Sequence, residues 1–227
     1  MAATVGVDPR TDASEQHKLV DALFAPTDIA VLVYFRVVFG VLIAWHAVHD
    51  LLGHHVPRVL HAPVLFTYWP FTFVKPLPGP LLYGVEYLLV IAGAFVAVGL
   101  YYRVSAALVF AGVTYLFLLD AGEYLNHLYL VGLFAFLMIF LPANRQWSLD
   151  ALFDPSMRRD VVPAWTVWLL RFQVGVPYFF GGIAKLNADW FRGEPLRTML
   201  LEHRNFPLIG HFFTNSALVH FFVWGMK

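Results

Sequence analysis

The stretch "YLFLLDAGEYLNHLYLVGLFAFLMIF", residues 115–140, places a short polar segment between two apolar runs. The polar segment carries Asp120, Glu123, Asn126 and His127, whereas the apolar runs on either side hold no charged residue. Such a pattern is typical of a helical hairpin that crosses a bilayer twice, because backbone polar groups in lipid must be paired within helices. The stretch therefore predicts a transmembrane helical bundle.

The composition of the whole chain agrees with this prediction. Its 227 residues are 59% hydrophobic and 13% charged, whereas a soluble domain is about 25% charged. A formal net charge of zero gives no indication of a nucleic-acid partner. The chain has no cysteine, which excludes disulfides, thiolate catalysis and cysteine metal ligands. We therefore expect an integral membrane protein with lipid as its surroundings.

Apolar segments of roughly 17–25 residues are long enough to span a bilayer. A shorter stretch at 210–225 stops at Lys227 after about 16 residues, which predicts a partial sixth span and a chain that ends within a helix. We predict an all-α polytopic bundle with a polar N-terminal tail, residues 1–25, and a transmembrane domain, residues 26–227. The five predicted full spans are about 28–49, 80–99, 103–119, 125–141 and 164–184.

Alternating spans bring distant polar residues to one side of the membrane. We name the side where the first span begins face A and the opposite side face B. The first, third and fifth spans then end at face B, where the fourth begins. The polar residues predicted at face B are His46, His49, Asp50, Asp120, Glu123, Asn126, His127, Lys185, Asn187 and Asp189.

Lys185 lies in "GGIAKLNADWFRG", residues 181–193, and has two interpretations. A lysine at a helix end can keep its stem in apolar surroundings and extend its ammonium to the headgroups. Alternatively, burial disfavours the ammonium and makes a neutral amine available as a base. The glycines at 181 and 182 would let another backbone or a flat ligand approach closely.

Asn126 and His127 place an amide and an imidazole at the start of an apolar run. They could form an interhelical hydrogen bond or cap the helix. They could also hold a ligand oxygen opposite Lys185 across face B, and both interpretations stay open.

The histidines near the end of the first span suggest a metal site. His46, His49 and Asp50 share one helical face, and His54 and His55 follow. We nevertheless expect no metal site, because no second ligand motif occurs elsewhere in the sequence.

Arg36 lies within the first span, where facing lipid would cost about 2.5–3.5 kcal/mol. It therefore needs an inward partner. We expect an ion pair with Glu86 of the second span, and a direct catalytic role is the alternative.

Several motifs together resemble a known family. "YLNHLYL" (124–130), "PANRQWSLDALF" (142–153) and "GGIAKLNADWFRG" are similar, in order and spacing, to the membrane domain of vitamin K-dependent gamma-glutamyl carboxylase and its bacterial HTTM-domain relatives. The resemblance covers about residues 26–205. The chain differs from the family at two positions. Ala184 stands where the family commonly has a second lysine, and Asn187 stands where an aspartate is usual.

The resemblance implies a chemistry and a location. Lys185 would be the base that deprotonates reduced vitamin K, the hydroquinone cofactor, with Asn126 and His127 assisting at the quinone. Trp190 and Asp189 would belong to the turn that helps bind the cofactor. Epoxidation by O2 would drive addition of CO2 to a peptide glutamate, in a lyase-type reaction with epoxidase activity. The expected protein is a truncated bacterial homologue in the cell membrane, without the family's extracytoplasmic domain.

Two other functions remain open. The same fold could serve as a non-catalytic membrane scaffold or lipid- or quinone-binding bundle, because fold does not fix function. A metal-dependent membrane enzyme built on the histidines of the first span is the second alternative.

Overall fold

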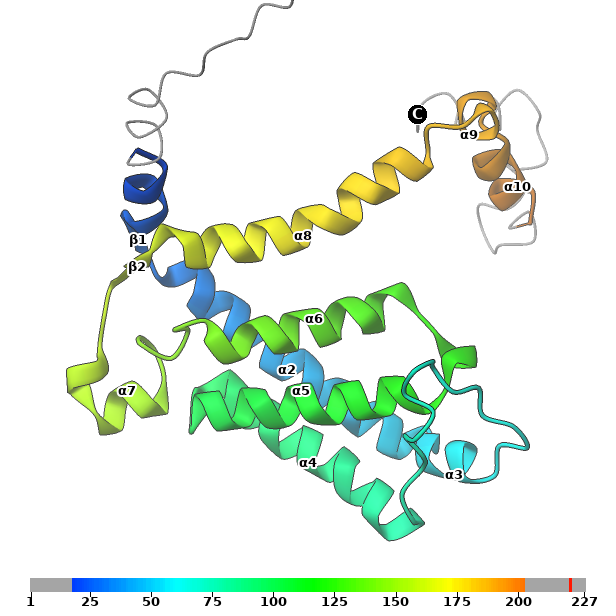
Figure 1. The fold of residues 1–227 in the computed structure, drawn as a ribbon, viewed down its shortest axis with the longest axis horizontal. Coiled ribbons are helices and arrows are strands. Elements are labelled where there is room, and N and C mark those ends of the chain that lie inside the picture. Colours follow the sequence, from blue (N-terminus) through cyan, green and yellow to red (C-terminus); the bar gives the residue numbers. More distant parts are fainter. Residues whose placement is uncertain (1–17, 203–220, 222–227) are drawn as a thin grey trace, which may run out of the picture. The chain divides into compact units, whose positions relative to one another are not determined.

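A computed structural model of the chain describes residues 18–202 and Phe221. The chain divides into two compact units, Met1–Arg171 and Phe172–Lys227, and each is described by itself. Residues 18–24 are helical. The other elements of the first unit are β1 (Pro26–Asp28), α2 (Ala30–Leu52), α3 (His55–Leu60), α4 (Gly79–Val98), α5 (Tyr102–Leu119), η1 (Ala121–Glu123), α6 (Asn126–Phe140), α7 (Leu149–Phe153), η2 (Pro155–Met157) and β2 (Val161–Pro163) (Figure 1). Helix α8 (Ala164–Ala184) begins in the first unit, and the second unit contains α9 (Ala188–Arg192) and α10 (Glu194–Glu202).

The predicted all-α transmembrane bundle is confirmed, with a different count of spans. Among the described residues, four helices are long and apolar enough to cross a membrane, namely α2, α4, α5 and α8. The fourth predicted span is α6, whose 15 residues extend only about 22 Å, against a hydrocarbon core of about 30 Å. Apart from Phe221, the predicted partial sixth span and the chain end lie outside the described residues, as do residues 1–17 of the predicted tail.

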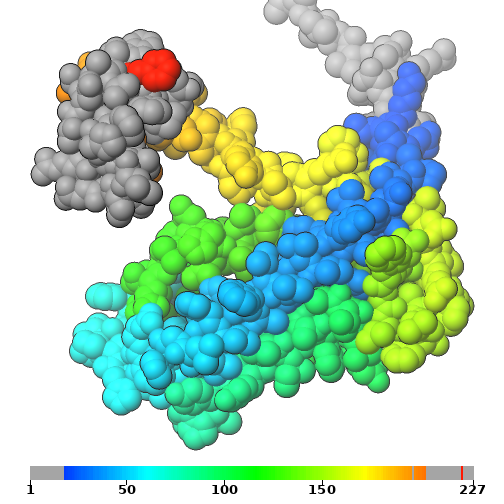
Figure 2. Space-filling view, turned by 180° about the vertical axis from the view of Figure 1, so that it is seen from behind, coloured from blue at the N-terminus to red at the C-terminus, as the bar shows by residue number. Residues whose placement is uncertain are grey.

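Helices α2 and α4 lie side by side (Figure 2), and their backbones approach closely in an antiparallel pair. A Cβ atom added at Gly40 would collide with the backbone of Ala97, and one added at Gly93 would lie 2.8 Å from Ala44 N. Residue numbers that rise along α2 thus face residue numbers that fall along α4, so the two helices run in opposite directions. Small residues allow this contact, which supplies the van der Waals packing that stabilises helix pairs in lipid.

Helices α4, α5 and α6 continue the antiparallel order. The Tyr102 hydroxyl, at the start of α5, donates to Met138 O near the end of α6 at 2.7 Å. A Cβ atom at Gly112 of α5 would meet the Leu89 side chain of α4. The starts of α4 and α6 therefore lie at the same end of the first unit as the ends of α2 and α5, which is the arrangement expected at face B.

A short antiparallel ladder joins the entries of α2 and α8 at face A. Strand β1 pairs with β2, with Pro26 opposite Pro163 and Asp28 opposite Val161. Asp28 Oδ1 accepts from Ala30 N at 2.7 Å and so satisfies a free N–H group at the start of α2. The first turns of α2 and α8 are consequently held at one end of the first unit.

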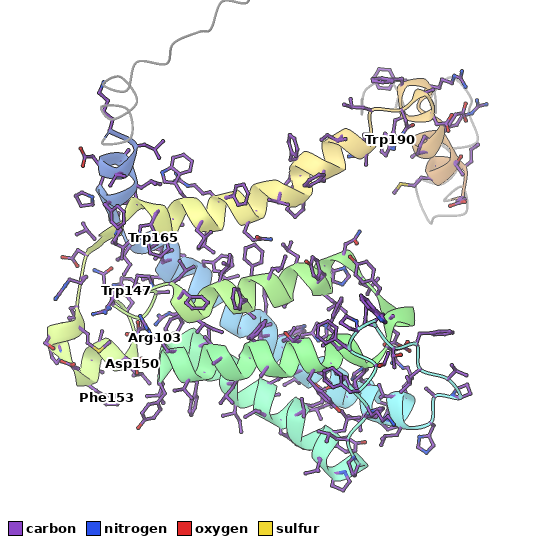
Figure 3. All side chains as sticks on the ribbon, viewed as in Figure 1. Arg103, Trp147, Asp150, Phe153, Trp165 and Trp190 are labelled. Carbon is purple, nitrogen blue, oxygen red and sulfur yellow. The ribbon has the colours of Figure 1, made fainter. Side chains whose placement is uncertain are left out.

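The segment between α6 and β2 closes face A of this unit (Figure 3). Asp150 accepts from Tyr101 N at 2.8 Å, Tyr102 N at 3.0 Å and Asn144 Nδ2 at 2.9 Å, so its carboxylate caps the start of α5. Trp147 O accepts a hydrogen bond from the Arg36 guanidinium.

The expected Arg36–Glu86 ion pair is wrong. Each residue lies about two turns from the start of its helix. Because α2 and α4 are antiparallel, these starts lie at opposite faces. Arg36 contacts the loop at face A, and Glu86 contacts His55 at face B.

Candidate functional site

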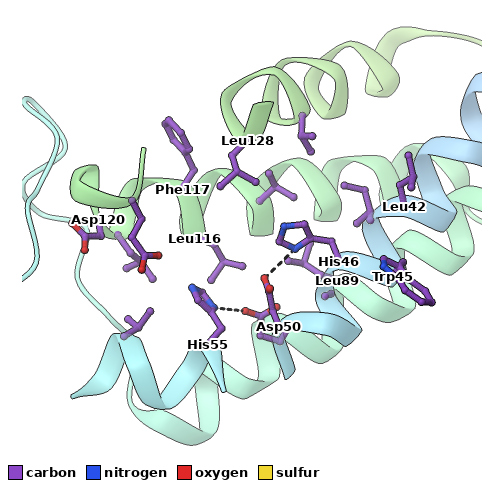
Figure 4. Close-up of a pocket in the computed structure, with 18 of the residues that line it drawn as sticks. Leu42, Trp45, His46, Asp50, His55, Leu89, Leu116, Phe117, Asp120 and Leu128 are labelled. Atoms are coloured by element: carbon purple, nitrogen blue, oxygen red, sulfur yellow. Dashed lines mark hydrogen bonds and ion pairs between the residues drawn. The ribbon is translucent and has the colours of Figure 1, made fainter. Parts of the chain in front are cut away.

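An apolar cavity of about 300 Å³ opens at the face-B end of the first unit (Figure 4). Most of its wall comes from apolar side chains of α2, α5 and α6, including Ile43, Leu116 and Leu128. Polar groups gather at one end, which suits an apolar ligand with oxygen atoms. The ionisable residues that line it are His46, Asp50, His55, Glu86, Asp120 and Glu123.

Glu86 is the fully buried acid of this cavity. It lies in α4, and its Oε1 is 2.9 Å from His55 Nδ1. His55 reaches it because α2 ends at Gly53 and His54 adopts a left-handed conformation, with φ of 59°, before α3 begins. The hydrogen bond to Glu86 raises the pKa of His55 above its ordinary value, against the opposing effect of burial.

A second histidine–carboxylate contact lies beside the first. His46 Nδ1 is 3.0 Å from Asp50 Oδ2, one turn apart on α2. His49 Nδ1 is 3.7 Å from the same carboxylate, but its side chain is 76% exposed. The trio considered from the sequence, His46, His49 and Asp50, is therefore not the group that the structure brings together around the buried acid.

Asp120 has a structural role at the cavity rim. Its Oδ1 accepts from Gly122 N at 2.8 Å and from Phe66 N at 3.1 Å. It thereby ties the segment between α3 and α4 to the turn between α5 and α6. Glu123 lies 4.0 Å from Arg58 in an exposed ion pair, which contributes little stability because solvent screens it.

Asn126 and His127 are the first two residues of α6, and both are exposed. Neither forms a side-chain hydrogen bond with another described residue, and the helix has no side-chain N-cap bond. The cavity wall includes their neighbours Glu123 and Leu128 but neither of them. The role predicted for this pair is thus not explained by contacts within the first unit.

The "KLNADW" turn, residues 185–190, is an ordered element of the second unit. Asn187 Oδ1 accepts from Trp190 N at 3.0 Å, and its Nδ2 donates to Ala184 O at 2.8 Å. These bonds join the end of α8 to the start of α9. Lys185 is exposed rather than buried, and its Nζ lies 4.9 Å from the centre of the Trp190 ring. Asp189 is also exposed, in the first turn of α9.

The predicted face-B residues fall into two groups. His46, Asp50, Asp120 and Glu123 line one cavity of the first unit, which confirms that these distant positions meet. Lys185, Asn187 and Asp189 belong to the second unit, while Asn126 and His127 belong to the first. That Lys185 forms one site with Asn126 and His127 remains a prediction.

The sequence analysis did not pair Glu86 with His55. Glu86 stands out as an acid within an apolar run, and such residues commonly mark functional sites. Because α2 and α4 are antiparallel, Glu86 lies at the depth of the end of α2 and not at that of Arg36. This depth would have indicated the histidines after His46 as its partners.

The profile of the HTTM domain matches residues 24–226, nearly the whole described part of the chain. No solved structure matches it. The match covers the cavity in the first unit and the "KLNADW" turn in the second. The chain therefore belongs to the HTTM domain family.

Proposed function

We propose that this protein is a membrane-embedded, vitamin K-dependent carboxylase-like enzyme. It couples epoxidation of the hydroquinone by O2 to γ-carboxylation of a peptide glutamate, and Lys185 is its base. Support comes from membership of the HTTM domain family and from the "KLNADW" motif within the matched residues.

The observation that carries this proposal is the setting of Lys185. The two hydrogen bonds of Asn187 order the turn, and the Lys185 ammonium lies against the Trp190 ring. Lys185 makes no ion pair with another described residue. An exposed cation–π contact of this kind contributes about 0.5–1 kcal/mol. The side chain is thus positioned by an ordered turn and an aromatic ring.

Each site residue then has a specific task. Lys185 accepts a proton from a hydroxyl of the reduced quinone, while the Asn126 amide and His127 imidazole hydrogen-bond to its oxygens. Trp190 positions Lys185, and Asp189 belongs to the same turn. The bound hydroquinone supplies the reducing equivalents for O2, and CO2 is the co-substrate. The cavity of the first unit has apolar walls, which fits a quinone ring.

Hydroquinone turnover by the purified full chain in lipid nanodiscs tests this proposal. Epoxide formation should require O2 and should fall by about 10²–10⁴-fold in Lys185→Ala and Lys185→Arg, because arginine stays protonated and cannot act as a base. Lys75→Ala is the matched control. Lys75 is also exposed. Its backbone carbonyl accepts a hydrogen bond from the Tyr115 hydroxyl, and its side chain forms none with the described residues.

Added small amines should partly restore Lys185→Ala and not Lys185→Arg, whose side chain still fills the site. Full activity in Lys185→Arg would reduce the lysine to a membrane anchor. If the wild-type protein binds the hydroquinone without forming epoxide, the non-catalytic quinone-binding bundle is the correct interpretation.

A further inference from the structure

Three ligand-type side chains from different elements converge at the polar end of the cavity. Asp50 comes from α2, His55 from α3 and Glu86 from α4, and one donor atom from each lies within 4.8 Å of the other two (Figure 4). We propose that Asp50, His55 and Glu86 form a binding site for one divalent transition-metal ion.

An unpaired oxygen points to a missing partner in this cluster. Glu86 is 0% exposed, and its Oε1 contacts His55. Its Oε2 is buried and has no hydrogen-bond partner among the described residues. Buried polar atoms are almost always satisfied, and a coordinated cation would satisfy this one.

The charges of the cluster also suit a dication. In the metal-bound form, two carboxylates and a neutral imidazole carry a charge of −2, which one divalent ion cancels. The alternative is two imidazolium–carboxylate pairs, His55 with Glu86 and His46 with Asp50. These pairs would also be neutral overall, but they leave Glu86 Oε2 without a partner.

The donor atoms select a class of metal. Magnesium and calcium prefer oxygen ligands, whereas zinc and ferrous iron accept imidazole together with carboxylates. In tetrahedral coordination at about 2.0–2.2 Å, the donor atoms lie about 3.3–3.6 Å from one another. The donor atoms of the three side chains lie within 4.8 Å of one another, so rotation of these side chains that closes the widest separation by about 1–1.5 Å would complete the site.

The surroundings resemble those of metal sites that keep an open position. His46 Nδ1 donates to Asp50 Oδ2 at 3.0 Å and would orient this ligand, as outer hydrogen bonds do at metal centres. Three protein ligands leave a fourth position for water or a ligand oxygen. Since all three line the cavity, the ion would lie where the oxygen of an apolar ligand could reach it.

Metal titration of the untagged full chain in detergent tests the site. After dialysis against a chelator, Zn2+ should bind at one equivalent, and Co2+ should give visible absorption bands of a nitrogen- and oxygen-coordinated ion. Glu86→Gln and His55→Gln should lose these bands. His46→Gln should weaken binding by about 10–100-fold, as expected of an outer partner.

His61→Gln is the matched control, because the chain has ten histidines that could bind zinc nonspecifically. His61 is exposed at the end of α3, and among the described residues its ring forms a hydrogen bond only with Pro57 O. It should keep the Co2+ bands and the affinity of wild type. Size-exclusion chromatography and circular dichroism identify misfolded variants, and Asp50→Asn replaces Glu86→Gln if the latter fails to fold.

Unchanged affinity in a folded Glu86→Gln or Asp50→Asn variant would overturn the proposal. So would an equal loss in His61→Gln, or the absence of stoichiometric binding by wild type. Hydroquinone turnover is not measured in this experiment, so its result is independent of the role proposed for Lys185.

Discussion

The two ends of the α2–α4 pair each bury one ionisable side chain, with opposite charge and different surroundings. Arg36 and Glu86 are both 0% exposed. At face A, a loop of the same chain closes over Arg36, and the nearby carboxylate of Asp150 is occupied by two backbone N–H groups and an amide. At face B, the carboxylates of Asp50 and Glu86 contact histidine side chains and line a cavity.

The difference separates a structural polar cluster from a binding site. Backbone N–H groups that occupy a carboxylate hold it in one geometry and leave little room for a ligand. Side chains that can exchange a hydrogen bond for a ligand, beside an open cavity, can bind one. We therefore infer that face A of the first unit stabilises the fold, while its face B carries function.

The largest expected effect on stability comes from removing Asp150. Asp150→Ala takes away the acceptor of three hydrogen bonds and the carboxylate that favours the buried charge of Arg36. Breaking a buried charge arrangement costs about 3–5 kcal/mol. Denaturant unfolding in detergent, followed by circular dichroism, measures this loss.

Asp50→Ala is the face-B counterpart of that variant. Asp50 accepts no backbone hydrogen bond among the described residues, and its partner His46 is largely exposed, so the loss should be below about 1 kcal/mol. Equal losses in the two variants would contradict the distinction between the two faces.

An intermediate loss of stability is expected at the close contact between α2 and α4, which lies between the two ends. Gly40→Ala would push a Cβ atom into the backbone of Ala97 and separate α2 from α4. Overpacking of this kind costs about 1–3 kcal/mol. Gly132→Ala in α6 is the control, because a Cβ atom there meets no atom of the described residues within 4 Å. It should stabilise the helix by about 0.5–1 kcal/mol, and thermal unfolding should shift in opposite directions for the two variants.

Much of this comparison could be predicted from the sequence. Continuous apolar runs bounded by proline, glycine and charged residues gave helix bounds within a few residues of α2, α4, α5, α6 and α8. Alternation of the spans then predicted that His46, Asp50, Asp120 and Glu123 would meet. Helix length was the weaker prediction, since α6 is shorter than an average span.

The partners of the buried charges could not be predicted from the sequence. Arg36 bonds to a backbone carbonyl of a loop, and residue type gives no information about such an acceptor. Glu86 meets His55 only because Gly53 and the left-handed His54 reverse the chain after α2. Loop conformations of this kind decide which side chains meet, and they leave no periodic pattern.

The smallest expected loss of stability is at Asn187 of the second unit, where a structural role can again be separated from ligand binding. Asn187 belongs to the motif proposed for catalysis, yet its amide bonds to Trp190 N and Ala184 O, as a structural residue does. Asn187→Ala should destabilise α9 by about 1 kcal/mol, the usual cost of a lost N-cap. Asn187→Asp keeps the acceptor for Trp190 N and should lose less. Amide hydrogen exchange at residues 188–192 measures the difference.

If Asn187 acts only by ordering the turn that sets Trp190 against Lys185, epoxide formation should fall in proportion to the lost protection. An activity loss in Asn187→Ala as large as that of Lys185→Ala, with exchange unchanged, would instead make Asn187 a ligand-contacting residue.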